Sequence, residues 1–187
     1  MVQLTRIYTR GGDKGRTSLG SGTRVAKYDS RIVAIGAVDE ANTSVGIARL
    51  YSDDDVDNVL NVIQNDLFDM GADLCVPQGP GLRLTQEQVI FLENTIDRLN
   101  SELSPLNSFV LPGGTHASAY LHQARAVTRR AERDVCVLHK KEPLNPFVIH
   151  YINRLSDLLF VMARFANNKG AGDVLWIPGG QQRHQQG

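Results

Sequence analysis

The sequence predicts an all-α protein, a five-helix bundle with ferritin-like up-and-down topology that follows a glycine-rich N-terminal loop. Apolar residues recur at steps of three and four along most of the chain, as they do on the buried face of an amphipathic helix. Alternation of the kind that marks strands is almost absent, and the helical stretches are joined by short connections, which suit antiparallel neighbours. The 187 residues suffice for one domain with a substantial core.

The first two predicted helices run from residue 30 to 50 and from Asp53 to Cys75. The first has its apolar positions at Ile32, Ile35, Val38, Ala41, Val45 and Ala48. The second has a narrower apolar stripe at Val56, Leu60, Ile63, Leu67, Met70 and Leu74. Three aspartates open the second helix, where negative charge meets the positive end of the helix dipole. The segment VPQGPGL then ends it with prolines and glycines.

Three further helices follow. Thr85 and Gln88 form a capping box before a third apolar stripe at Val89, Leu92, Ile96, Leu99 and Leu103. The irregular segment SFVLPGGT leads to a fourth helix, from Thr115 or a neighbour as its cap to about His139. A fifth begins with Asn145 as N-cap and Pro146 at the first helical position, and Gly170 is expected to stop it. Its apolar positions are Val148, Ile152, Leu155, Leu159, Met162 and Ala166.

We expect a single domain made of an N-terminal loop (5–28), the bundle (29–170) and a polar tail (171–187). The tail after Trp176 lacks periodicity and is expected to be mobile. A net charge of zero argues against nucleic-acid binding. The two cysteines show no metal-binding or disulfide spacing, and no apolar run reaches the roughly 20 residues of a membrane span. With no apolar signal segment either, these features predict a cytoplasmic protein.

Three groups of residues have no obvious role in a helix bundle that is purely structural. The first is the segment TRGGDKGRTS, residues 9–18. Its glycines let the backbone approach a ligand and turn successive N–H groups toward an anion, and its basic and hydroxyl side chains could complete a polyphosphate cradle. A plain turn-rich loop would have the same composition, and the segment is not a Walker A loop because GxxxxGK[ST] is absent. Both interpretations remain open on these residues alone.

The second group is a stripe on the fourth predicted helix. Arg125, Arg129, Glu132 and Arg133 share one face because they are three and four residues apart, and Arg130 adjoins them. Arginine forks bind phosphate at two points, so the stripe is a plausible triphosphate clamp. A solvated face held by Glu132 is the alternative. Aligned arginines repel one another, however, so they need an anion or a carboxylate nearby.

The third group consists of polar residues on the first and fifth predicted helices. Asp39 and Asn42 lie beside the apolar face of the first helix, where an unpaired carboxylate would be unfavourable. Asn153 and Asp157 lie one turn apart on the fifth. These residues suggest a polar site, and surface positions or local pairs explain them equally well. A di-iron site is excluded because no Glu has a His three residues later, and a serine hydrolase because the chain has no GxSxG elbow.

Four segments, taken in order, resemble one known family. They are IYTRGGDKGRTSL, FVLPGGT, ARAVTRRAERDV and NRLSDLLFVMAR. The combination resembles the propanediol-utilisation type of ATP:cob(I)alamin adenosyltransferase over nearly the whole chain, from about Arg6 to Arg164. The resemblance implies a five-helix bundle that assembles as a homotrimer with active sites between subunits. It also implies transfer of the 5′-deoxyadenosyl group of ATP to cob(I)alamin, giving adenosylcobalamin and triphosphate.

The resemblance assigns site residues as well. For ATP it implies Thr9, Arg10, Gly11, Gly12, Thr17, Ser18, Lys27, Arg129, Arg130, Glu132, Arg133 and Asn153. Arg10 stands where many relatives have lysine, which keeps the charge and changes the geometry of the fork. Mg²⁺ is expected to bridge phosphate oxygens, with no metal ligands from the chain.

For the corrinoid, the resemblance implies that Phe109 packs under the ring and displaces its lower axial ligand. Asp39 would pair with Arg125 across the subunit boundary. Removing the axial base eases reduction of the cobalt, and charge neutralisation on triphosphate would be the role of Arg129 and its neighbours. A flavin reductase and an adenosylcobalamin-dependent mutase are implied as partners.

Two rival interpretations fit the residues without the resemblance, and a third fits only part of them. Another ATP-using enzyme on the same bundle, a phosphotransferase or hydrolase, would release ADP or phosphate instead of triphosphate. A corrinoid or nucleotide carrier would bind without turnover. A purely structural oligomer would leave the loop and the arginine stripe without a purpose.

Overall fold

The computed structural model describes residues 7–77 and 81–179 and contains the five expected helices. These are α1 Ser30–Arg49, α2 Asp54–Cys75, α3 Gln86–Asn100, α4 His116–Lys141 and α5 Pro146–Phe165. The bundle prediction is confirmed. Residues 5–6 of the predicted loop, 78–80 of the predicted break and 180–187 of the predicted tail lie outside the described residues.

Helices α3 and α5 begin at the caps that the sequence predicts, and Thr85 and Gln88 form the expected capping box. Asp53, predicted only to place negative charge at the start of α2, is also its cap, since its carboxylate accepts a hydrogen bond from the Val56 amide at 3.0 Å. Asn145 caps α5, with Pro146 in its first turn. Each of these side chains satisfies amide groups that a helix leaves unpaired at its start.

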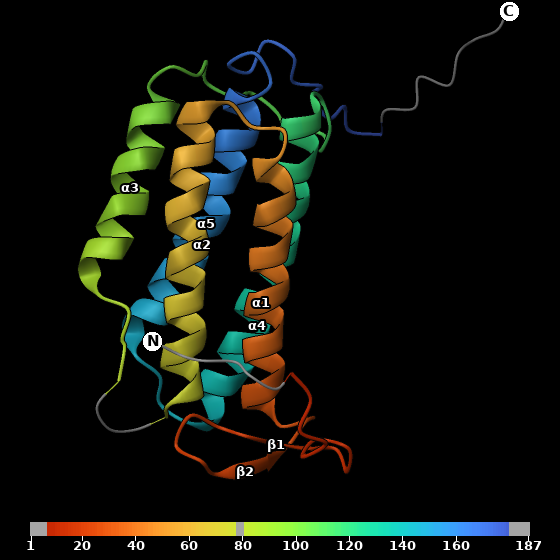
Figure 1. Ribbon diagram of the computed structural model, residues 1–187. Coiled ribbons are helices and arrows are strands. Elements are labelled where there is room, and N and C mark those ends of the chain that lie inside the picture. The colour runs from red at the N-terminus through yellow and green to blue at the C-terminus, as the bar shows by residue number, and fades with distance from the viewer. Residues whose placement is uncertain (1–6, 78–80, 180–187) are drawn as a thin grey trace, which may run out of the picture.

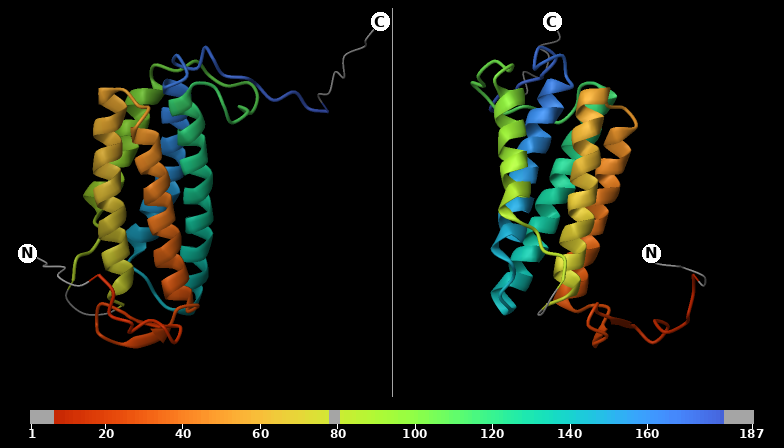
Figure 2. Two further views of the ribbon diagram at one scale, coloured as in Figure 1. Left: turned by 45° about the vertical axis from the view of Figure 1, so that its right-hand side comes forward. Right: turned by 60° about the vertical axis from the view of Figure 1, so that its left-hand side comes forward.

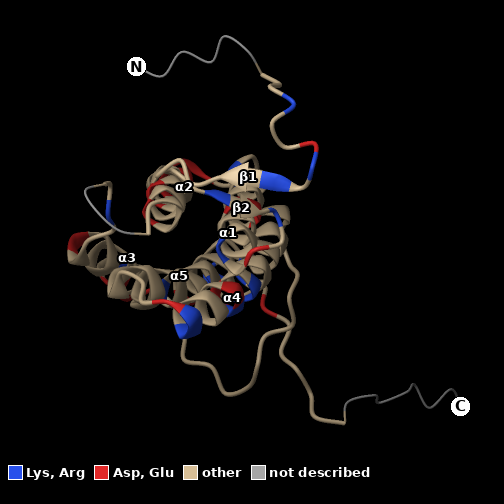
Figure 3. Ribbon diagram, turned by 90° about the horizontal axis from the view of Figure 1, so that it is seen from below, with Lys and Arg blue, Asp and Glu red and all other residues tan. Residues whose placement is uncertain are grey.

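The helices run alternately up and down, so α1 is antiparallel to α2 and to α4 (Figure 1). The views in Figures 1 and 2 show α3 and α5 running in the same direction. Packing pairs α1 with α2, α1 with α4, α4 with α5, and α3 with α5. Seen along the axis, the helices therefore follow one another round the bundle as α2, α1, α4, α5 and α3 (Figure 3).

A buried polar contact joins three helices inside the apolar core. Tyr151 of α5 is fully buried, and its hydroxyl donates to the Asp66 carboxylate of α2 at 2.9 Å. Gln88 of α3 donates to the same carboxylate at 2.7 Å. Burial raises the pKa of Asp66 and raises the pKa of Tyr151 well above its ordinary value. The contact fixes α2 against α3 and α5.

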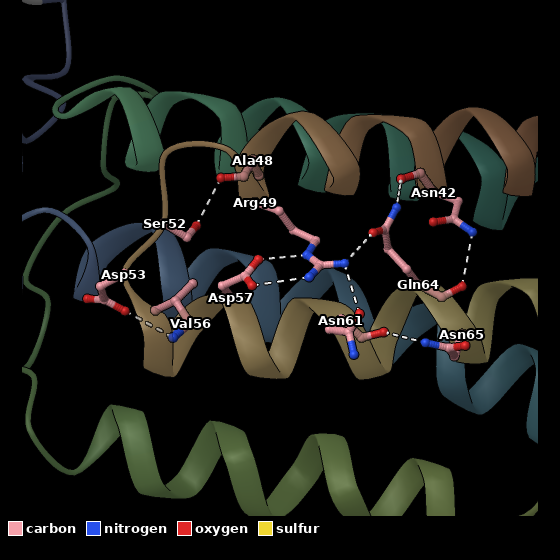
Figure 4. A network of polar contacts seen from close by, with 10 residues as sticks. All are labelled: Asn42, Ala48, Arg49, Ser52, Asp53, Val56, Asp57, Asn61, Gln64 and Asn65. Atoms are coloured by element: carbon pink, nitrogen blue, oxygen red, sulfur yellow. Dashed lines mark hydrogen bonds and ion pairs between the residues drawn. The ribbon is translucent and has the colours of Figure 1, made fainter.

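A second polar network joins α1 to α2 (Figure 4). The Arg49 guanidinium binds both oxygens of Asp57, at 2.6 and 3.1 Å, and also donates to Asn61 and Gln64. Asn42 and Gln64 each donate to the other's backbone carbonyl, at 3.0 and 3.2 Å. The arginine holds the pKa of Asp57 below its usual range. The short connection between the two helices is thus reinforced by side chains.

Three features differ from the predicted boundaries. α3 ends at Asn100, so Leu103 of its predicted apolar stripe lies beyond the helix. A small antiparallel hairpin, β1 Arg16–Ser18 with β2 Arg24–Ala26, interrupts the predicted N-terminal loop. Its strands have only three residues each, too few to produce visible alternation. α5 ends at Phe165 instead of continuing to Gly170, because turns follow in which the Gly170 amide, at φ +83°, reaches the Arg164 carbonyl at 2.9 Å.

Candidate active site

The glycine-rich loop and its hairpin lie at one end of the bundle, called here the loop end (Figure 1). The hairpin is attached to the bundle through Gly20, whose amide donates to the Cys75 carbonyl at 3.0 Å and to its sulfur at 3.1 Å. From residue 16 back to residue 7 the chain runs away from the helices (Figure 2). Most of the loop is therefore exposed.

Within the loop, the predicted ATP residues come together around the glycines. Arg24 fixes the loop by donating to the Gly11 carbonyl at 2.6 Å. A Cβ atom added at Gly12 would lie 3.0 Å from the Lys27 ammonium, and one at Gly11 would lie 3.5 Å from the Thr9 hydroxyl. One small region thus contains the predicted residues Thr9, Gly11, Gly12 and Lys27. In it the Lys27 ammonium lies beside glycine backbone that no side chain covers.

The other predicted loop residues lie on either side of this region. Arg10 has a left-handed backbone, with φ of 60°, and its guanidinium stacks over the Tyr8 ring at 5.8 Å. Thr17 is half-buried in β1, and the Ser18 hydroxyl accepts from Arg24 at 3.4 Å. Sequence reasoning missed Arg24, which holds the loop to the hairpin. Figure 3 shows the concentration of Lys and Arg on this part of the chain.

The arginine row, Arg125, Arg129 and Arg133, lies along one side of α4 as its spacing predicts. No member of the row is in an ion pair within residues 7–77 and 81–179; Arg133 donates to the Arg129 carbonyl at 2.9 Å. Arg125 is half-buried, and its buried Nε atom has no hydrogen-bond partner. Burial, and to a smaller extent the charge of Arg129, lowers the pKa of Arg125.

The nearby carboxylates are already engaged elsewhere. Glu132 accepts from the Asn153 amide of α5 at 3.0 Å, and Arg130 forms an ion pair with Glu40 of α1. Neither carboxylate neutralises the arginine row. Three aligned positive charges without an acid partner form a site that suits an anion.

At the other end of the bundle, called here the tail end, a cavity of about 580 Å³ opens beside Phe109. It is lined by Leu106, Asn107, Ser108, Phe109, Val110, Arg125 and Phe160. The Phe109 ring is 76% exposed and faces Trp176 edge-on, with 6.0 Å between ring centres. The cavity therefore places an exposed aromatic ring near one end of the arginine row, next to its most buried member.

Asp39 occupies the surface position that the sequence left open. It is exposed on α1, so its carboxylate avoids the unfavourable burial beside the apolar face. Asn42 is the buried member of that pair, and Asp157 of α5 is exposed. Within the described part of the chain, neither Asp39 nor Arg125 has an ion pair, so the two do not meet inside one subunit.

Taken together, one chain assembles two groups of predicted residues. The loop end carries the glycine loop with Lys27, and the tail end carries Phe109 and Arg125 with the arginine row extending from it (Figure 1). Sequence reasoning missed Phe160 and Trp176. The apolar run from Val174 to Ile177, within an otherwise polar tail, was the signal for Trp176.

Two classes of site are not found in the described residues. No cluster of three or more His, Cys, Asp or Glu side chains within residues 7–77 and 81–179 could hold a metal ion. None of the helices in the same ranges is long and apolar enough to cross a membrane.

Comparison with known proteins identifies relatives along almost the whole chain. The cobalamin adenosyltransferase family model matches residues 7–166. The corrinoid adenosyltransferase of Mycobacterium leprae is 48% identical over 191 residues, which cover 96% of this chain and 99% of the relative. The corrinoid adenosyltransferase of Bacillus subtilis is 42% identical over 176 residues, with 90% and 91% covered.

Comparison with solved structures leads to the same family. A PduO-type ATP:corrinoid adenosyltransferase from Lactobacillus reuteri, a Phe-to-Ala variant complexed with cobalamin and ATP, superimposes with a TM-score of 0.87 at 38% identity and covers 91% of this chain and 99% of its own. An Arg-to-Lys variant complexed with ATP gives a TM-score of 0.86 at 39% identity, with 91% and 100% covered. The chain therefore belongs to the cobalamin adenosyltransferase family, and within it to the PduO-type ATP:corrinoid adenosyltransferases.

Proposed function

We propose that this corrinoid adenosyltransferase transfers the 5′-deoxyadenosyl group of ATP to the cobalt of cob(I)alamin. Cobalt supplies an electron pair to the 5′-carbon, a cobalt–carbon bond forms, and the bond from that carbon to the triphosphate oxygen breaks. Triphosphate leaves with the electron pair of the broken bond, and cobalt(I) becomes cobalt(III). The reaction needs no nucleophile or general base from the chain, which instead positions the substrates and neutralises charge.

The observation that carries the proposal is the arginine row without an acid partner. Triphosphate gains negative charge as it leaves, and preorganised guanidinium groups stabilise such charge most when water is scarce. Arg129 and Arg133 fill this role. Arg130, Glu132 and Asn153 hold the nucleotide beside them, since the Asn153–Glu132 hydrogen bond fixes α5 against this part of α4.

The glycine loop holds the rest of the ATP. Thr9, Arg10, Gly11 and Gly12 provide backbone N–H groups, a hydroxyl and a cation, while Lys27 lies beside Gly12. Thr17 and Ser18 continue the same surface from β1. Mg²⁺ would accompany the triphosphate held by these residues and would supply further positive charge there.

The corrinoid occupies the cavity at the tail end. The exposed ring of Phe109 packs against the lower face of the corrin and excludes the axial base, which makes the cobalt easier to reduce. Phe160 and Leu106 extend the apolar wall, and Arg125 supplies the one charge in the lining.

The L. reuteri structures support the choice of Phe109 and Arg129. The phenylalanine and the arginine substituted in those two variants are 20 residues apart in their chain, which is also the separation of Phe109 and Arg129 here.

The active enzyme is a homotrimer with sites between subunits in this proposal. Asp39 and Arg125 have no ion-pair partner within the described part of one chain, and pairing across a boundary would give each an opposite charge. The loop of one subunit likewise completes the site on a neighbour, because the loop and the Phe109 cavity lie at opposite ends of a single bundle. A flavin reductase would supply the electrons, and an adenosylcobalamin-dependent mutase would use the product.

The test is an anaerobic reaction of the purified protein with chemically reduced cobalamin and Mg-ATP. We expect the visible spectrum to change to that of adenosylcobalamin, with one triphosphate released per cobalamin converted. ADP or orthophosphate as the product would point to another ATP enzyme. Binding of both substrates without a spectral change would instead point to a carrier.

A further inference from the structure

The segment 174–176, beyond the residues that the family model matches, pairs with the segment that carries Phe109. The Leu111 amide donates to the Val174 carbonyl at 2.8 Å, and the Trp176 amide donates to the Phe109 carbonyl at 2.7 Å. Val110 and Leu175 form the antiparallel bridge between these two bonds. The Ser108 hydroxyl adds a third hydrogen bond by donating to the Trp176 carbonyl at 2.6 Å. Residues 108–111 are thus held as one edge of a short two-stranded pairing.

A buried cluster anchors this pairing to α5. The Asp173 side chain, only 3% exposed, accepts from Arg164 at 2.7 Å and from Asn167 at 3.0 Å. Arg164 also donates to the Ser104 carbonyl at 3.0 Å, and Asn167 accepts from the Thr115 amide at 3.3 Å. The cluster therefore ties down the tail segment and both ends of the connection that contains Phe109.

We propose that Trp176 is a positioning residue that sets the orientation of the Phe109 ring toward the corrinoid. This inference rests on the proposed function and names a residue in addition to those already assigned to it. Phe109 is 76% exposed and lies in the connection between α3 and α4, so the helices restrain its ring little. The contacts that do restrain it come from the 174–176 segment, and the only ring among them is that of Trp176, whose edge-to-face contact is a favoured aromatic geometry.

Loss of the Trp176 side chain should affect the reaction step more than the binding of either substrate. A ring that must exclude an axial ligand acts only in a narrow range of positions, and displacements of about 1 Å can lower turnover strongly. Without the Trp176 side chain, Phe109 keeps its backbone pairing and gains rotamer freedom. Fewer bound corrinoids then lose their lower ligand, while ATP, which is held elsewhere, binds as before.

The experiment compares Trp176→Ala, Trp176→Phe and wild type by three measurements. These are kcat, the KM for ATP, and the fraction of cob(II)alamin without a lower axial ligand, from its electron paramagnetic resonance spectrum in the presence of ATP. We expect Trp176→Ala to lower kcat about tenfold and to lower that fraction, with an unchanged KM for ATP. Trp176→Phe, which keeps an aromatic edge, should recover most of both losses. Ile177→Ala, next in the chain and exposed, is the matched control.

A double-mutant cycle separates positioning from general structural damage. If Trp176 acts through Phe109, then Trp176→Ala has no further effect on kcat in a Phe109→Ala background. Additive losses in the double variant, or wild-type kcat and spectrum in Trp176→Ala, overturn the inference. Ser108→Ala, which removes one link and keeps the ring, provides a second variant with the same expected direction if Trp176→Ala does not fold. Failure of the wild type to make adenosylcobalamin would overturn the proposed function instead, so the two failures are distinguishable.

Discussion

The loop end and the tail end of the bundle both carry predicted substrate contacts, yet they are built in opposite ways. The loop is held by its own hairpin and meets the bundle through Gly20 and Cys75, with its glycine backbone exposed. The segment around Phe109 is paired with residues 174–176 and anchored by a buried ion pair between Arg164 and Asp173. One end is left for a ligand or a neighbouring subunit to organise, whereas the other is organised in advance by its own chain.

This difference indicates a division of labour. A polyphosphate is flexible and highly charged, so an adaptable cradle of N–H groups and cations can bind it. In the proposed function an aromatic ring displaces an axial ligand, and a ring that is already held in position does so at a smaller entropic cost. The comparison can be tested at each end, starting with the change that should have the largest effect.

The largest expected effect is on stability at the tail end. Asp173→Ala leaves the nearly buried Arg164 guanidinium without a counter-charge, which should lower the free energy of unfolding by about 3–5 kcal/mol. Denaturant unfolding measures it. Glu102→Ala, which removes the exposed ion pair with Lys169, is the control and should lose no more than about 1 kcal/mol. Equal losses in the two variants would contradict a preorganised tail end.

Between the two ends, Arg129→Ala should lower kcat by roughly 10²–10³-fold, as the loss of one preorganised charge contact can. Stability should change little, because the Arg129 side chain is exposed and has no ion pair among the described residues. Steady-state kinetics measures the effect, and Arg98→Ala on α3, which breaks an exposed ion pair with Asp55, is the control. Near-normal turnover in Arg129→Ala would refute its role.

At the loop end, Gly12→Ala should raise the KM for ATP by about tenfold, or 1.4 kcal/mol of binding. The added methyl group would lie 3.0 Å from the Lys27 ammonium and would displace it from the cradle. Gly71→Ala in α2 is the control, because its Cβ meets no atom within 4 Å. It should leave the KM unchanged and stabilise the helix by about 0.5–1 kcal/mol. An unchanged KM in Gly12→Ala would place the phosphates elsewhere.

The smallest expected effect is that of His122, near the tail end, on the pH dependence of the free energy of unfolding. His122 is buried with no hydrogen-bond partner for either ring nitrogen, and burial, then the charge of Arg125, lower its pKa below 6.5 despite the opposing effect of Asp173. Because the unfolded chain binds a proton first, stability falls as the pH drops from 6.5 toward the folded-state pKa. His122→Leu should show a weaker fall than wild type in urea unfolding at pH 7 and pH 5. An equal loss of stability in both proteins between pH 7 and pH 5 would mean that His122 does not contribute to the pH dependence of stability.

Much of the bundle could be predicted because helix signals are local. Apolar spacing located the five helices, and Thr85, Thr115 and Asn145 located the starts of α3, α4 and α5. The arginine row was also predictable, because a helix turns spacing directly into a shared face. The end of α5 was placed too late at Gly170, since turns beyond Phe165 retain part of the same spacing.

The contacts that could not be predicted join residues far apart in the sequence. Trp176 with Phe109, and Asp173 with Arg164, lie across a turn that no periodicity describes. Residues 171–187 were interpreted as a polar tail, but Asp173 is buried and 174–176 pair with the Phe109 segment. The sequence left open whether Asp39 is exposed, because the apolar stripe of α1 is broad and helical spacing alone does not mark its edge.

The closeness of Gly114 to Asn167 has a consequence for how this sequence can diversify. A Cβ atom at Gly114, whose φ is +101°, would collide with the Asn167 amide. Any other residue at position 114 would be strained by that backbone conformation, and it would also need a smaller residue at position 167 and a new partner for the Thr115 amide. Position 114 therefore stays glycine for as long as this turn precedes α4, whereas position 167 is restricted by its hydrogen bonds to the Thr115 amide and to Asp173.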